Sequence, residues 1–210
     1  MITNWEEYRK RLPKYPDKDL KLIEAGFELA KTAHEGQKRT SGEDYIAHPI
    51  EVSLKTAKIG LDPKAITAAL LHDTVEDTST ELKTVRKKFG DEVAFLVNAL
   101  TKVNAVHLQS DEKTVESARK MFLAVAQDIR VVVIKLLDRL HNMETLKALA
   151  PEKQKRISQE TLEIYAPIAD RLGMGELKAN LEDLAFEYAH PEEYFPVLFI
   201  PVRQEIERSN

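Results

Sequence analysis

The sequence predicts an all-α protein, a compact bundle of several helices. Apolar residues recur at three- and four-residue spacing along most of the chain, for example at Leu20, Ile23 and Phe27, and this is the period of a helix face. Runs that alternate apolar and polar residues between turns, as strands do, are scarce. Of the 210 residues, 43% are hydrophobic, which is enough to bury one substantial core.

Proline and glycine residues predict where individual helices begin and end. Asp62 and Pro63 should open a helix that runs to Leu71, because proline is favoured in the first helical turn. The same kinds of signal mark further expected starts at Thr80–Glu81, Pro151 and Pro191 and expected stops at Gly90 and Gly173.

Two nearly uninterrupted apolar runs predict central helices that are buried on most sides. They span Ala65–Leu71 and Val131–Leu137. The start of the second run, Val131–Ile134, is also compatible with a strand, but the apolar residues that follow, Leu140 and Met143 among them, keep helical spacing. We therefore expect a helix there.

Composition excludes several classes of function. The chain has 31 basic and 35 acidic residues, a net charge of −4, and this lacks the basic surplus that binds nucleic acid. No apolar run reaches the roughly 18 residues of a membrane span, and the first residues do not form a signal peptide. We expect a cytoplasmic protein. Cysteine is absent, so any metal must be held by His, Asp and Glu.

A cluster of polar residues follows the first buried run. His72, Asp73, Glu76 and Asp77 come directly after Leu71, and continued helical geometry would place His72 beside Glu76 and Asp73 beside Asp77. Burying a carboxylate next to an imidazole is costly unless a charged group compensates, and a divalent cation is the usual compensation. Solvated charges at a helix end are the alternative reading.

Two further residues complete a metal-binding set of two histidines and two carboxylates. His48 precedes Pro49, and Asp138 lies at the end of the second buried run. With His72 and Asp73, they form a mixed nitrogen and oxygen site that suits Mn²⁺, Fe²⁺ or a similar ion, with Mn²⁺ as first choice. Taken alone, His48 can also be a buried histidine bonded to backbone, and Asp138 can pair with Lys135 or Arg139. His141 is expected to orient Asp138 from behind.

From about residue 20 to 195, the chain resembles the hydrolase domain of the RelA/SpoT homologues, including their free-standing small alarmone hydrolases. These are HD-type domains, so the resemblance implies an HD-domain bundle. Five segments carry it: Arg39–Pro49, Ala68–Thr78, Asp128–Arg130, Lys135–Met143 and Glu160–Pro167.

The resemblance implies roles for individual residues. His48, His72, Asp73 and Asp138 match the family's manganese ligands, and Glu76 and Asp77 match the acidic pair required for hydrolysis. The expected substrate-binding residues are Arg39, Ser41, Asn142 and Thr145.

The substrate-binding stretch departs from the family at one position. The family usually has Arg-Lys-Ser, whereas this chain has Arg39, Thr40 and Ser41, so one cation is missing and Lys38 is a candidate replacement. A guanidinium fits phosphate oxygens and also stacks on a purine, which suits Arg39, although a solvated loop arginine is the alternative. Asn142, four residues after Asp138, should share its helix face.

The function implied by the resemblance is manganese-dependent hydrolysis of the 3′-pyrophosphate of (p)ppGpp to GDP or GTP. A cation of this kind activates water for attack on phosphorus, and Glu76, Asp77 or both would orient or deprotonate that water. Two alternatives remain open: an HD phosphohydrolase for another nucleotide, such as a dNMP or NADPH, and a catalytically silent domain that senses the alarmone.

We expect residues 1–195 to form the hydrolase domain and residues 196–210 a helical extension. The amphipathic segment Val197–Ile206 can cap the domain or pair two subunits, so a homo-oligomer is one expectation. The sequence is equally compatible with a free-standing small hydrolase and with part of a bifunctional synthetase and hydrolase.

Overall fold

The computed structural model describes residue 2, residues 4–104 and residues 127–198. The chain divides into two units, residues 1–149 and residues 150–210. The described residues form helices and no strand, with one isolated antiparallel bridge between Lys38 and Asp44. The prediction of an all-α protein is therefore confirmed.

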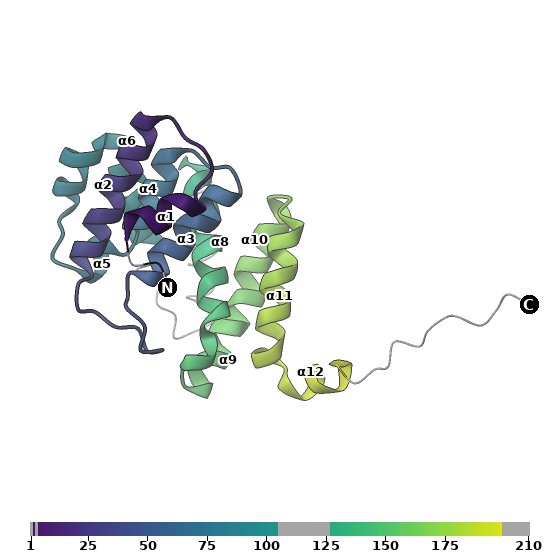
Figure 1. The fold of residues 1–210 in the computed structure, drawn as a ribbon. Coiled ribbons are helices and arrows are strands. Elements are labelled where there is room, and N and C mark those ends of the chain that lie inside the picture. Colours follow the sequence, from purple (N-terminus) through teal and green to yellow (C-terminus); the bar gives the residue numbers. More distant parts are fainter. Residues whose placement is uncertain (1, 3, 105–126, 199–210) are drawn as a thin grey trace, which may run out of the picture. The chain divides into compact units, whose positions relative to one another are not determined.

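The first unit is built from helices that surround α4 (Figure 1). In chain order the described elements are α1 (Trp5–Arg11), α2 (Asp17–Ala33), α3 (Ala47–Lys58), α4 (Pro63–Leu71), α5 (Thr74–Asp77), α6 (Leu82–Asn104), α8 (Ile129–Glu144) and the short 3₁₀ helix η1 (Leu146–Ala148). Helix α4 packs against α2, α3, α6 and α8, which makes it the centre of the unit.

The helix ends in this unit follow the sequence signals. Asp62 caps α4 by accepting hydrogen bonds from the backbone N–H groups of Lys64 and Ala65, and Pro63 occupies the first turn. Helix α6 begins at Leu82, directly after the predicted Thr80–Glu81 start. Gly90 interrupts α6 with a φ of 86°, a conformation that glycine adopts without steric cost.

The two apolar runs are the buried centre of the unit, as predicted. Every residue from Ala65 to Leu71 and from Val131 to Asp138 is buried. The strand alternative for Val131–Ile134 is wrong, because these residues lie within α8. The largest side chains with almost no exposed surface are Tyr8, Ile23, Phe27, Ile50, Ile66, Leu70, Leu71, Leu96, Leu100, Ile134 and Leu136.

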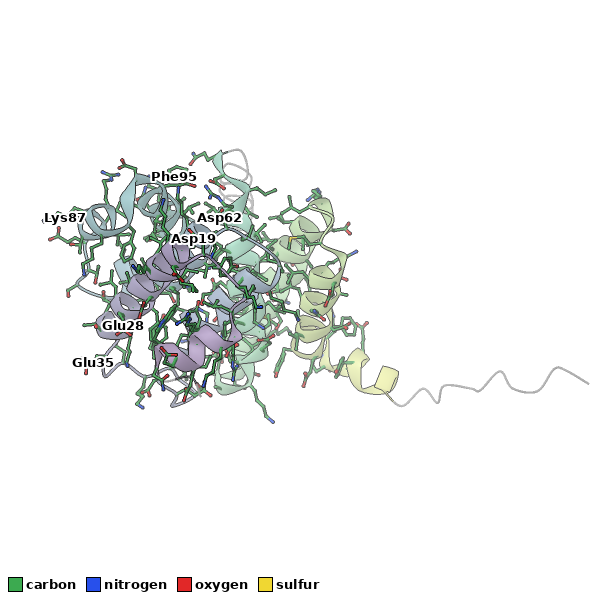
Figure 2. The ribbon with its side chains drawn as sticks, turned by 45° about the horizontal axis from the view of Figure 1, so that its top comes forward. Asp19, Glu28, Glu35, Asp62, Lys87 and Phe95 are labelled. Carbon is green, nitrogen blue, oxygen red and sulfur yellow. The ribbon has the colours of Figure 1, made fainter. Side chains whose placement is uncertain are left out.

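Charged side chains lie on the outer faces of the helices, as amphipathic spacing requires. Glu28 on α2 and Lys87 on α6 are exposed examples (Figure 2). Phe95 on α6 is an apolar exception, with 40% of its surface exposed. None of the described helices has the length and apolar character needed to span a membrane.

The second unit is also helical. It contains α9 (Pro151–Glu160), the π-helical turn η2 (Thr161–Tyr165), α10 (Ala166–Arg171), α11 (Gly175–Ala189) and α12 (Pro191–Leu198). Pro151 and Pro191 begin helices and Gly173 follows α10 with a φ of 72°, as predicted. The π turn precedes Pro167, whose missing N–H removes the normal helical hydrogen bond at this point.

The expected domain boundary at residue 195 stays a prediction. The boundary between the two units falls between residues 149 and 150, inside the range expected for the hydrolase domain. Residues 199–210, which make up most of the expected C-terminal extension, lie outside the described residues.

Candidate metal centre and active site

His72 directs its Nε2 toward the carboxylates at the end of α4. Its ring is 1% exposed, and its Nδ1 lies 2.7 Å from the carbonyl oxygen of Ala69. Since a carbonyl only accepts, Nδ1 is the donor, and in the neutral ring the lone pair is then on Nε2. That Nε2 is buried, has no hydrogen-bond partner among the described residues, and lies 3.2 Å from Oδ1 of Asp73.

His48 and Asp138 approach this pair from two other helices. Nε2 of His48, in the first turn of α3, lies 3.0 Å from Oδ1 of Asp138 on α8 and 3.7 Å from Oδ2 of Asp73. His48, His72 and Asp138 each offer a ligand atom, and these atoms all lie within 4.8 Å of one another. The structure thus brings together the four residues that the sequence predicts as metal ligands.

This arrangement fits a divalent cation. Nε2 of the neutral His72 ring lies 3.2 Å from a carboxylate oxygen of Asp73 with no hydrogen bond between them, which is unfavourable in a buried site unless a positive charge lies there. A cation would satisfy this nitrogen and both carboxylates at once, and imidazole with carboxylate is a donor set that first-row divalent metals accept. The residues present therefore form a group able to bind a metal, and this metal group consists of His48, His72, Asp73 and Asp138.

Lys135 and Asn142 each hold one carboxylate oxygen of Asp138. Nζ of Lys135 lies 2.5 Å from Oδ2 of Asp138, and the amide of Asn142 donates to Oδ1 over 2.8 Å. Burial alone would raise the pKa of the Asp138 carboxyl, but the charge of Lys135 holds this pKa well below its usual range. The ion pair with Lys135, which the sequence offered as an alternative to metal binding, coexists with the metal group.

Tyr45 connects Asp73 to the acidic pair, and sequence reasoning did not single it out. Its hydroxyl lies 3.0 Å from Oδ2 of Asp73 and 2.7 Å from Oδ2 of Asp77, and its ring stacks on His34 with centroids 4.6 Å apart. The available signal was its place in the Arg39–Pro49 segment, three residues before His48.

The acidic pair lies on the single turn of α5. This turn is helical, because the backbone N–H of Asp77 bonds to the carbonyl of Asp73, four residues earlier, over 2.8 Å. Glu76 and Asp77 are exposed, and the amide of Gln37 donates to the backbone carbonyl of Asp77. Both carboxylates are accessible to water next to the buried metal group.

Of the four predicted substrate-binding residues, Arg39 and Asn142 contact the site. Nη2 of Arg39 donates to Oδ1 of Asn142 over 2.7 Å, and Asn142 in turn bonds to Asp138. Ser41 is exposed in the loop before α3, and the hydroxyl of Thr145 bonds to backbone carbonyls of its own helix. For these two residues, no described hydrogen bond reaches the metal group.

Lys38, the candidate replacement for the missing cation at Thr40, points to another partner. Its Nζ lies 2.6 Å from Oδ1 of Asp44, and both side chains are more than half exposed. The loop that carries Arg39 is thus closed by an exposed ion pair.

His141 contacts His48 rather than Asp138, which differs from our expectation. Its Nδ1 lies 2.8 Å from Nδ1 of His48 and 3.3 Å from Nη1 of Arg39. Burial, followed by the nearby charges of His48, Arg39 and Lys55, lowers the pKa of His141 to about 3. His141 is therefore a neutral imidazole behind the metal group.

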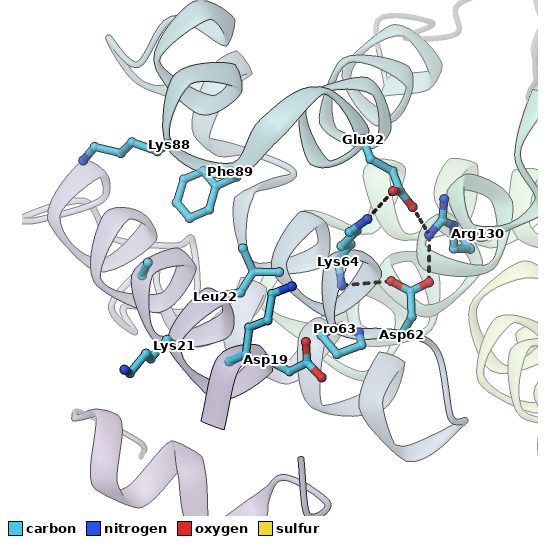
Figure 3. A pocket seen from close by; sticks show the side chains of 12 residues that line it. Asp19, Lys21, Leu22, Asp62, Pro63, Lys64, Lys88, Phe89, Glu92 and Arg130 are labelled. Atoms are coloured by element: carbon cyan, nitrogen blue, oxygen red, sulfur yellow. Dashed lines mark hydrogen bonds and ion pairs between the residues drawn. The ribbon is translucent and has the colours of Figure 1, made fainter. Parts of the chain in front are cut away.

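A second polar cluster lies at the other end of α4 and was also missed by the sequence analysis. Arg130 bonds to Asp128, Asp62 and Glu92, and it borders a hollow of about 620 Å³ whose lining includes Leu22 and Phe89 (Figure 3). These bonds tie the first turns of α4 and α8 to α6.

The comparisons with known proteins agree with this fold. A solved structure described as a metazoan ortholog of SpoT that hydrolyzes ppGpp matches 87% of this chain and 99% of its own, with a TM-score of 0.59 and 28% identity. A Myxococcus xanthus protein named GTP pyrophosphokinase is 47% identical over 185 residues, which is 86% of this chain and 24% of that protein.

An Aquifex aeolicus protein named guanosine-3′,5′-bis(diphosphate) 3′-pyrophosphohydrolase is 47% identical over 189 residues, which is 90% of this chain and 27% of that protein. The chain thus spans about a quarter of the length of these curated relatives. A family model described as HD domain matches residues 26–175. Because this match covers more than half of the chain, the chain belongs to the HD domain family.

Proposed function

We propose that this chain is a guanosine-3′,5′-bis(diphosphate) 3′-pyrophosphohydrolase that removes pyrophosphate from the 3′ position of (p)ppGpp and leaves GDP or GTP. The observation that carries the proposal is the convergence of the metal group with the acidic pair: Tyr45 bonds to Asp73 on one side and to Asp77 on the other. The similarity to proteins named for this activity supports the choice of substrate.

Manganese is the metal that we propose, held by His48, His72, Asp73 and Asp138. When bound, a divalent metal lowers the pKa of water and offsets the charge of phosphate oxygens. Among the described residues, the four proposed ligands are buried, and the acidic pair next to them is exposed. The substrate therefore approaches from the side of α5.

Glu76 and Asp77 act on the attacking water. One oxygen of Asp77 accepts a hydrogen bond from Tyr45, which fixes that carboxylate, and Glu76 extends from the same turn of helix. We assign to the two carboxylates jointly the tasks of orienting and deprotonating water.

Arg39 and Asn142 bind the substrate beside the metal. Arg39 is half-buried, and its guanidinium presents several N–H donors in a fixed plane, which suits phosphate oxygens and the face of guanine. Ser41, in the loop before α3, and Thr145, directly after α8, are the two further contacts that we propose. A cytoplasmic location belongs to the same proposal.

The test is hydrolysis of ppGpp by the metal-stripped protein with and without Mn²⁺, followed by ion-exchange separation of GDP and pyrophosphate. Asp73→Ala and Glu76→Ala should each abolish release, the first by disrupting the metal group and the second by removing a carboxylate. Glu28→Ala, an exposed glutamate of α2, is the matched control and should retain full activity.

Thr40 makes a panel of nucleotides a necessary part of this test, since one expected cation is absent there. Manganese-dependent release from a dNMP or NADPH, with none from ppGpp, would assign the site to another nucleotide. Binding of ppGpp without turnover by a folded, manganese-loaded protein would instead identify an alarmone sensor and overturn the proposal.

A further inference from the structure

We propose that His141 is a positioning residue: by accepting a hydrogen bond from His48, it keeps the Nε2 lone pair of His48 directed at the metal group. This inference deepens the proposed function and rests on its metal site, but it does not depend on which nucleotide is the substrate. Its basis is the close approach of two buried imidazoles that are 93 residues apart in the chain.

The first step concerns the two nitrogens of His48. Its Nε2 faces the carboxylates, 3.0 Å from Oδ1 of Asp138 and 3.7 Å from Oδ2 of Asp73. Its Nδ1 lies 2.8 Å from Nδ1 of His141. Two ring nitrogens at this distance share one proton, so one is the donor and the other the acceptor.

The second step uses Arg39 to identify the acceptor. Nη1 of Arg39 lies 3.3 Å from the same Nδ1 of His141, and a guanidinium donates hydrogen bonds but does not accept them. Nδ1 of His141 therefore has the lone pair. The proton between the two rings belongs to Nδ1 of His48, and its Nε2 is left unprotonated, as a metal ligand must be.

The third step compares the two histidines of the metal group. His72 donates from Nδ1 to the backbone carbonyl of Ala69, over 2.7 Å. His48 has the same tautomer, but its acceptor is the side chain of His141. The backbone thus orients His72, whereas a side chain, which can be changed by mutation, orients His48.

Because the rings of His48 and His141 are buried, the orientation of His48 affects the affinity for the metal. His48 and His141 are 2% and 8% exposed, with ring centroids 4.9 Å apart. Without His141, the Nδ1–H of His48 would be buried with no acceptor, and the ring would gain by placing its proton on Nε2 next to Asp138. Loss of such a hydrogen bond behind a ligand weakens metal binding by about 10- to 100-fold in other proteins.

The experiment measures Mn²⁺ binding to the full chain by the electron paramagnetic resonance signal of free Mn²⁺, together with ¹⁵N spectra of the imidazoles without metal. We expect wild-type His48 to carry its proton on Nδ1. His141→Ala should weaken Mn²⁺ binding about tenfold or more, and His141→Asn, whose amide oxygen is an acceptor, should recover most of the affinity.

His190→Asn, which replaces an exposed histidine outside the site, is the control and should bind Mn²⁺ like the wild type. Unchanged affinity in folded His141→Ala, or a wild-type His48 protonated at Nε2, would overturn the proposal. If His141→Ala does not fold, the tautomer of His48 in the wild type and the Mn²⁺ affinity of His141→Asn still test the proposal. A protein that binds Mn²⁺ as described but leaves ppGpp intact would refute the proposed substrate and not the role of His141.

Discussion

The hydroxyl of Tyr45 lies 2.7 Å from Oδ2 of Asp77 and donates a hydrogen bond to it, with Oδ2 of Asp73 only 3.0 Å from the same oxygen. Burial, then the negative charges of these two aspartates, raises the pKa of Tyr45 far above its usual value. The phenol therefore stays protonated and always has a proton to donate. A cation held by Asp73, as proposed, would offset its charge and leave that proton to Asp77.

Tyr45→Phe should lower kcat for ppGpp hydrolysis about tenfold with little change in KM, because a hydrogen bond to a charged group contributes about 1.5 kcal/mol or more. The loss falls on kcat because the proposed role of Asp77 is to act on water rather than to bind the substrate. Steady-state kinetics at saturating Mn²⁺ measure this split. Tyr188→Phe makes the same chemical change on α11 and should have no effect, whereas an unchanged kcat in Tyr45→Phe would show that Asp77 needs no such support.

Metal addition should stabilise the protein through the same residues. At a free Mn²⁺ concentration 100 times its Kd, binding to the folded state alone adds about 2.7 kcal/mol to the free energy of unfolding. Thermal melts of metal-stripped protein with and without Mn²⁺ measure this rise. The increment should vanish in His72→Ala and persist in His190→Asn; an equal increment in His72→Ala would place the stabilising ion elsewhere.

Replacing Gly26 should test the close packing of α2 on α4. A Cβ at this position would lie 2.9 Å from Cγ2 of Thr67, so Gly26→Ala should lower the free energy of unfolding by about 1 to 3 kcal/mol, despite the higher helix propensity of alanine. Urea denaturation measures the change. Thr67→Ser removes the opposing methyl group and keeps the hydroxyl, so the double variant should regain most of the loss.

The control for this packing test is Gly175→Ala, where an added Cβ meets no atom within 4 Å. This variant should be neutral or slightly more stable. If Gly26→Ala and Gly175→Ala behave alike, helix propensity and not the contact with Thr67 decides the outcome.

The Arg130 cluster should make stability depend on pH. Hydrogen bonds from Arg130 hold the pKa of Asp128 below its ordinary 3.8, and against the effect of burial they also lower the pKa of Asp62. A carboxyl with a lowered folded-state pKa contributes stability that is fully present above its unfolded pKa and is lost as pH falls through the folded value. The contribution is thus present at neutral pH and disappears below about pH 4.

Arg130→Met should therefore lower the free energy of unfolding by about 1 to 3 kcal/mol at pH 7, with a gap from wild type that narrows as pH falls below about 4. Urea denaturation at pH 7, 5 and 3 follows the gap. Arg86→Met, which breaks the exposed pair with Asp91, is the control and should cost little at any pH. A gap that stays constant down to pH 3 would contradict the assigned role of Asp62 and Asp128.

The local sequence was sufficient to predict the helices and to single out His48, His72 and Asp138, which form a group able to bind a metal. Helical spacing and continuous apolar runs depend on neighbouring residues. They predicted the buried helices α4 and α8, with His72 directly after the first apolar run and Asp138 directly after the second. Proline and glycine predicted the breaks because they restrict or relax the backbone wherever they occur. The i,i+4 relation of Asp138 and Asn142 followed from the same periodicity.

Only the tertiary structure decided how the predicted ligands are held. Tyr45 reaches Asp77 across 32 residues, His141 reaches His48 across 93, and Arg130 reaches Asp62 across 68. No local pattern encodes such pairs, because the distance between two side chains on different helices depends on how those helices pack. The sequence by itself determined which residues are able to bind a metal, and the packing of α3, α4 and α8 determined which neighbours orient them.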